Sequence, residues 1–98
     1  MRCLWDHEGV PSVDERALLE ALLDAFDRLF DRQTTVVDVH ALLFATARGL
    51  RDPVFVEEVN AAERSLKEIV RSGTEPAEAV ERALDAVDPL RRRIAAQL

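Results

Sequence analysis

The sequence has a single cysteine, no tyrosine and no long stretch free of charge. Cys3 has no second cysteine to pair with, which excludes a fold stapled by internal disulfides. The longest uncharged stretch, residues 39–47, is far shorter than the roughly 20 apolar residues that a membrane-spanning helix needs. Acidic residues follow the start too closely for a secretory signal. We therefore expect a cytoplasmic protein.

Positive charge is outnumbered, with 13 basic residues against 19 acidic ones. The formal net charge is −6 and the isoelectric point is near 4.8. Nucleic acids and anionic membranes need a basic surface, so we expect neither as a partner. An acidic protein is suited instead to a basic protein partner. All but one of the 13 basic residues are arginine, which suggests a GC-rich bacterial genome.

Glycine and proline are few, with three and four residues, and most lie where helices are expected to begin or end. The hydrophobic fraction of 48% and the charged fraction of 33% are typical of a helix-rich globular protein. Residues 1–11 show no periodicity and are interpreted as an extended N-terminal arm. Residues 12–98 are interpreted as a single helical domain.

The first two helices are predicted from apolar spacing and from capping residues. Ser12 and Glu15 form a capping-box pattern ahead of a helix over residues 13–32. Its apolar positions recur at helical spacing and are Leu19, Leu22, Leu23, Phe26, Leu29 and Phe30. Thr35 and Asp38 repeat the cap ahead of a helix over residues 36–48, which we expect Gly49 to close in a left-handed conformation. This second helix is apolar nearly all round, so we expect it to be the most buried.

The third helix is expected to begin at Asp52-Pro53 and to end at Gly73. Its apolar seam has the steps of a helical bundle and consists of Phe55, Val59, Ala62, Leu66 and Ile69. A fourth helix begins at Thr74 or Glu75 and contains Pro89, which would kink it or restart it with Asp88 as the cap. The sequence thus predicts an all-α fold, an antiparallel four-helix bundle with a fourth helix kinked or restarted at Pro89.

Patterns for catalysis, cofactors and metals are weak. His40 lies two residues after Asp38, so the two side chains do not share a helix face, and we expect a half-buried histidine bonded to backbone or solvent. Cys3 and His7 are too few for a zinc site. Residues 31–42 lack the carboxylates and the glycine of a calcium loop. We expect no enzyme, no cofactor, no metal and no catalytic residue.

The charge pattern is the feature that points to a partner. Glu20, Asp24, Asp27 and Asp31 line one face of the first helix, opposite its apolar positions. A second acidic stripe follows on the fourth helix and consists of Glu78, Glu81, Asp85 and Asp88. Like charges at these spacings cost an isolated helix roughly 0.2–0.5 kcal/mol per pair. The stripes are either solvated faces or a surface for a basic protein, in which case the first-helix carboxylates and Asp38 are the expected contacts.

In length, acidity and helical content, and in the stretch DRQTTVVDVHALL over residues 31–43, the chain resembles the small helical immunity proteins and antitoxins of bacterial toxin systems. The resemblance implies a protein without catalytic activity that neutralises a cognate toxin. We expect the acidic helical surface to bind a basic domain of that toxin. An alternative is a homo-oligomer, for example a dimer that buries the apolar second helix and the seam of the third. A second alternative is a small-molecule-binding bundle around His40 and Phe44.

Overall fold

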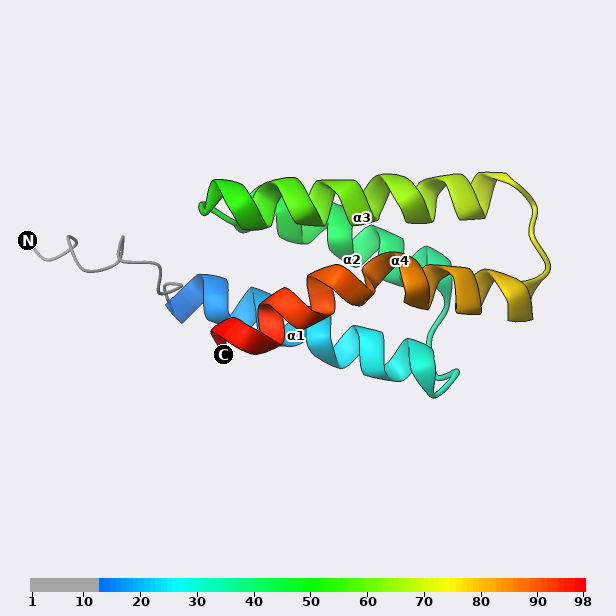
Figure 1. The fold of residues 1–98 in the computed structure, drawn as a ribbon, viewed down its shortest axis with the longest axis horizontal. Helices are drawn as coiled ribbons and strands as arrows, with labels where there is room; N and C mark the ends of the chain where they lie inside the picture. Colours follow the sequence, from blue (N-terminus) through cyan, green and yellow to red (C-terminus); the bar gives the residue numbers. More distant parts are fainter. Residues whose placement is uncertain (1–12) are drawn as a thin grey trace, which may run out of the picture.

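The computed structural model describes residues 13–98, which form four helices (Figure 1). Their bounds are α1 Val13–Phe30, α2 Val36–Gly49, α3 Pro53–Arg71 and α4 Pro76–Gln97. The prediction of an all-α fold with four helices is confirmed for this part of the chain. The expected N-terminal arm, the Ser12 cap and the weak Cys3–His7 metal pattern lie outside the described residues.

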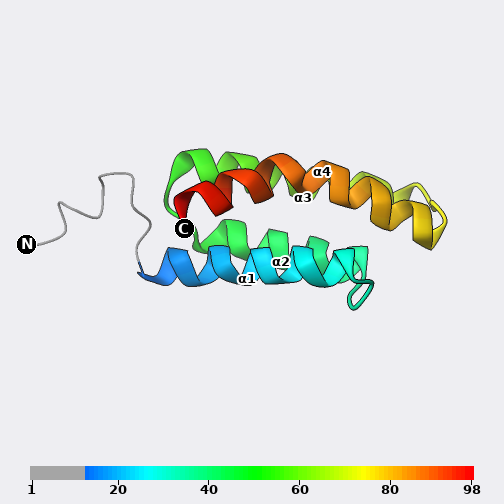
Figure 2. The same ribbon diagram turned by 60° about the horizontal axis from the view of Figure 1, so that its bottom comes forward.

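The four helices form a bundle of two layers, with α1 beside α2 and α3 beside α4 (Figure 2). Each helix packs against two neighbours, because α1 also contacts α4 and α2 also contacts α3. Across the middle, α2 touches α4. The C-terminus returns to the start of α1, where Nη2 of Arg16 lies 3.5 Å from the carbonyl oxygen of Leu98. No helix over residues 13–98 is both long and apolar enough to cross a membrane.

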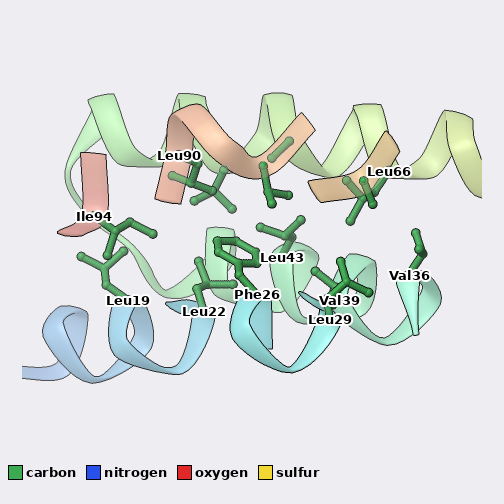
Figure 3. Close-up of a cluster of buried hydrophobic side chains, with 14 of the residues drawn as sticks. Leu19, Leu22, Phe26, Leu29, Val36, Val39, Leu43, Leu66, Leu90 and Ile94 are labelled. Carbon is green, nitrogen blue, oxygen red and sulfur yellow. The ribbon is translucent and has the colours of Figure 1, made fainter. Parts of the chain in front are cut away.

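The core is built from one apolar side of each helix (Figure 3). Phe26 lies near its centre, and Leu19 and Ile94 meet at one end. The predicted seam of the third helix is confirmed as an inward face, since all five of its residues are buried. Complete burial of a large apolar side chain contributes about 1.5–3 kcal/mol, so this shared core is what holds the bundle together.

Two predicted helix starts have the expected caps. The Oγ1 of Thr35 accepts the backbone N–H of Asp38 at 3.1 Å, ahead of α2. The Oδ1 of Asp52 accepts the backbone N–H of Val54 at 2.9 Å, and Pro53 occupies the first helical position. Each bond satisfies a donor that has no partner within the helix.

The two glycines at helix ends have different roles. Gly73 follows α3 with a φ of +71°, as the prediction of a closing glycine requires. For Gly49 the prediction was wrong, because it is the last helical residue of α2 and its φ is not positive. A Cβ at this position would lie 2.9 Å from Cδ1 of Leu18, so Gly49 allows α2 to end close against α1.

A left-handed closing residue occurs instead after α1, where the sequence has arginine. Arg32 has a φ of 63°. Its N–H donates to the carbonyl of Leu29 at 3.1 Å, and the N–H of Gln33 donates to the carbonyl of Arg28 at 2.7 Å. This bonding pattern closes a helix in the way that a glycine usually does.

The fourth helix runs through Pro89 without interruption. The predicted restart with Asp88 as cap is therefore wrong. The Asp88 carboxylate instead pairs with Arg91 and Arg92, at 2.9 and 2.8 Å, one turn further along the same helix. Leu90 and Ile94, beyond the proline, are buried in the core.

The second helix is not buried on every side, although its sequence is apolar nearly all round. Its inward side consists of the buried residues Val36, Val39, Leu43 and Thr46. On the outward side, Val37 and Phe44 are 57% and 53% exposed. A four-helix ring covers only the inward side of each helix, so an apolar helix keeps apolar residues at the surface.

Candidate partner-binding grooves

The five carboxylates predicted to bind a partner are exposed, but they do not form one continuous surface. Glu20 pairs with Arg16 at 3.4 Å on the surface of α1. Asp31 is exposed in the turn that follows α1. Asp24, Asp38 and Asp27 lie in grooves that α1 forms with its two neighbouring helices.

The first groove separates α1 from α2, has a volume of about 300 Å³ and contains both Asp24 and Asp38. Nε of Arg28 lies 3.1 Å from Oδ2 of Asp24 and offsets its charge. Oγ1 of Thr34 lies 3.5 Å from Oδ2 of Asp38. The two acids of this groove are thus already engaged by residues of the same chain.

The second groove separates α1 from α4 and has a volume of about 580 Å³. Its apolar residues are Phe26, Phe30, Leu84 and Val87, and its charged residues are Asp27, Glu81, Asp85, Asp88 and Arg91. Phe26 and Val87 are each only 1% exposed and form the floor, whereas Phe30 is 69% exposed. We call this feature the α1–α4 groove.

The α1–α4 groove holds carboxylates that have no ion-pair partner among residues 13–98. Asp27, Glu81 and Asp85 are exposed, and none of them forms an ion pair within residues 13–98. Asp88 is the exception, because Arg91 and Arg92 neutralise it. The groove therefore combines an apolar floor with three uncompensated negative charges from two helices, an arrangement that favours a basic side chain carried on an apolar surface.

One residue of this groove differs from the sequence-based prediction. Phe30 was predicted to point inward, but it lies at the last position of α1 and is the most exposed large apolar side chain of the described residues. Its four-residue step from Phe26 fits an inward position, so periodicity alone does not show that Phe30 is exposed. Glu81 and Asp85 belong to the second acidic stripe, which the sequence identified without showing that it faces the first.

His40 has a partner that the sequence did not predict. Its Nε2 lies 2.7 Å from Oε2 of Glu63 in α3, and the two side chains are 26% and 14% exposed. A histidine held by a carboxylate can in general act as a base. However, neither residue lines the α1–α2 groove or the α1–α4 groove. We interpret the pair as a polar tie between α2 and α3.

Other polar contacts also join helices rather than form a reactive centre. Nε of Arg93 lies 2.7 Å from Oε1 of Glu58, and this ion pair joins α4 to α3, although the buried oxygen accepts no hydrogen bond within residues 13–98. Glu15 is 8% exposed and accepts the backbone N–H groups of Arg51 and Asp52. In the part of the chain that the structure describes, no three acidic, histidine or cysteine side chains come together to hold a metal ion.

Comparison with protein-family models, with curated proteins and with solved structures finds no match to this chain. The functional argument therefore rests on the grooves and on the charges that line them.

Proposed function

We propose that this protein is a non-enzymatic protein-binding module of the bacterial cytoplasm, and that it neutralises a cognate toxin as immunity proteins and antitoxins do. The observation that supports the proposal best is the α1–α4 groove, which has an apolar floor and three carboxylates without an ion-pair partner in the described part of the chain. We infer that this groove, with Asp27 as its contribution from the predicted set, receives a basic domain of the toxin.

The charges and the aromatic residue have separate parts in this proposal. Uncompensated carboxylates attract a basic partner over a distance and raise the rate of association. Phe30, with 69% of its surface exposed beside the groove, supplies apolar area that a partner can bury. Glu20, Asp24 and Asp38 contribute to the long-range field, although each already has a contact on its own chain.

The proposal includes an antiparallel arrangement of consecutive helices and a bend of α4 at Pro89. Short connections over residues 31–35, 50–52 and 72–75 favour antiparallel neighbours. His40 and Glu63 lie at nearly equal sequence distances from the connection between α2 and α3, as partners on antiparallel helices do. A bend at Pro89 is the usual consequence of proline inside a helix. This arrangement sets the second half of α1 beside the first half of α4.

The groove can be tested with a defined probe, a synthetic amphipathic helical peptide that carries lysine and leucine. In a titration followed by ¹⁵N NMR, the largest shifts should occur at Asp27, Phe30, Glu81 and Asp85. The double variant Asp27→Asn/Asp85→Asn should lower the association rate about tenfold at low salt, and added salt should reduce the difference.

The matched control is Glu57→Gln/Glu68→Gln, which removes the same two charges from exposed positions of α3. It should bind the peptide nearly as well as the wild type does. Equal losses in the two double variants would mean that net charge alone attracts the peptide, and the groove assignment would be wrong.

The neutralising role needs a cellular experiment. The product of a toxin-like gene adjacent to this one, expressed in a heterologous host, should stop growth. Co-expression of the wild-type chain should restore growth, and co-expression of Asp27→Lys/Asp85→Lys should not. If the chain fails to restore growth and does not bind the gene product, toxin neutralisation is the wrong function, whatever the peptide experiment shows.

A further inference from the structure

The outward side of α2 is an apolar surface of five residues, which we call the α2 face. It consists of Val37, Ala41, Phe44, Ala45 and Arg48, all exposed and all on the side opposite the buried residues of the helix. Val37 and Phe44 keep more than half of their surface exposed. The guanidinium of Arg48 lies 5.6 Å from the centre of the Phe44 ring and covers part of it. A contiguous exposed apolar patch is a candidate site for protein–protein contact.

We propose that the α2 face binds the α2 face of a second copy of this chain, with the two helices antiparallel about a two-fold axis at the level of residue 43. The face is complementary to itself in this register. Asp38 and Arg48 lie at equal sequence distances from residue 43, so the carboxylate of each copy is placed at the level of the guanidinium of the other. A two-fold contact requires this kind of self-complementarity.

The same register explains the small residues of the face. Ala41 and Ala45 are also equally far from residue 43, so each alanine lies opposite the other across the axis and the two helices can approach closely. Phe44 lies next to the axis and packs against Phe44 of the second copy. Such an aromatic pair contributes in general beyond the area that it buries.

The location of the α2 face separates this contact from the proposed partner site. α2 faces α4 across the middle of the bundle, so its outward side points away from α4 and from the α1–α4 groove. A dimer formed through α2 therefore leaves the α1–α4 groove of each copy open, whereas Asp38 of the α1–α2 groove takes part in the contact. The dimer would carry two α1–α4 grooves, one on each copy. It could bind two toxin molecules, or bind one toxin that has two basic surfaces with a gain in avidity. The dimer does not depend on the proposed toxin.

The area of the α2 face sets the expected strength. A 14-residue helix with five exposed contact residues offers less than the ~800 Å² that each partner contributes to a standard stable interface. We therefore expect a reversible dimer with a dissociation constant of about 10–100 µM. Because the contact is mainly apolar, raising the salt concentration should not weaken it, in contrast to binding at the acidic groove.

Sedimentation velocity on the full chain, over a concentration series from about 5 to 500 µM, tests the proposal. The wild type should shift from monomer to dimer across the series. The variant Phe44→Glu should stay monomeric at the highest concentration. The matched control Val54→Glu places the same charge at a residue of α3 that is 48% exposed, and it should dimerise as the wild type does. Circular dichroism checks that each variant is folded, and Ala45→Arg replaces Phe44→Glu if that variant is not.

Three results would overturn the proposal. A wild type that is monomeric throughout the series has no such interface. Dimerisation of folded Phe44→Glu, or of folded Ala45→Arg, would place the interface elsewhere. Loss of the dimer in Val54→Glu as well would show that added charge, and not the α2 face, controls association. None of these results changes what the peptide titration says about the α1–α4 groove.

Discussion

Nε2 of His40 lies 2.7 Å from Oε2 of Glu63, and this contact joins α2 to α3 across a largely buried boundary. Both side chains are partly shielded from water, so each loses hydration on folding and regains a hydrogen bond from the other. Removing either partner alone leaves a polar group with less solvent than it has in the unfolded chain.

We therefore expect His40→Ala and Glu63→Ala each to lower the free energy of unfolding by about 1–2 kcal/mol. The double variant should cost less than the two single variants together, with a coupling of about 1 kcal/mol. Denaturant unfolding of the four proteins gives this coupling directly. Strict additivity would show that the two side chains do not interact in solution.

Glu15 provides a second prediction, because its carboxylate accepts the backbone N–H groups of Arg51 and Asp52 at the connection between α2 and α3. Glu15→Ala would leave these two donors without their acceptor in a poorly hydrated place. We expect a loss of about 2–3 kcal/mol in the free energy of unfolding. Glu20→Ala, which removes an exposed carboxylate with an ion pair along the same helix, should cost about 0.5 kcal/mol or less. Equal losses would contradict the bonding role of Glu15.

Arg32 occupies a left-handed conformation that glycine adopts without steric cost. The strain for a residue with a Cβ is about 1–2 kcal/mol, and glycine would relieve it. Glycine also gives the unfolded chain more conformational freedom, which cancels about 0.5–1 kcal/mol of that stabilisation. Arg32→Gly should thus raise the free energy of unfolding by about 0.5–1 kcal/mol, measured by thermal or denaturant unfolding.

The complementary variant is Gly73→Ala, at a φ of +71° where an added Cβ meets no atom within 4 Å. It should lower the free energy of unfolding by about 1 kcal/mol through backbone strain alone. We expect the free energy of unfolding to rise in Arg32→Gly and to fall in Gly73→Ala. A destabilised Arg32→Gly would mean that the arginine side chain, whose Nη1 lies 3.1 Å from the carbonyl oxygen of Phe30, contributes more than its backbone costs.

Pro89 is exposed and lies inside a continuous helix. Its ring removes one backbone hydrogen bond and crowds the preceding turn. Pro89→Ala restores the donor, so we expect an increase of about 1 kcal/mol or more in the free energy of unfolding, measured by denaturant unfolding. A destabilised variant would show that a bend at this proline is needed to bring Leu90 and Ile94 into the core.

Local sequence was sufficient to predict the number of helices and most of their ends. Asp52-Pro53, Thr35 and Gly73 act within a few residues of their own position, so their effect can be read without knowing the rest of the molecule. Gly49 was misread because the reason for its glycine is Leu18, which is distant in sequence and close only in the folded chain. Arg32 carried no local signal, since arginine rarely takes a left-handed conformation.

The candidate site shows the same division. The sequence by itself determined that acidic residues repeat along one face of α1 and one face of α4, because helical periodicity depends only on spacing. Only the tertiary structure decided that Asp27 shares a groove with Glu81 and Asp85, that Asp24 and Asp38 lie in another, and that Phe30 and Phe44 stay at the surface. Which helix neighbours which, and how far round each helix the core extends, depends on packing of the whole bundle. No single helix contains that information.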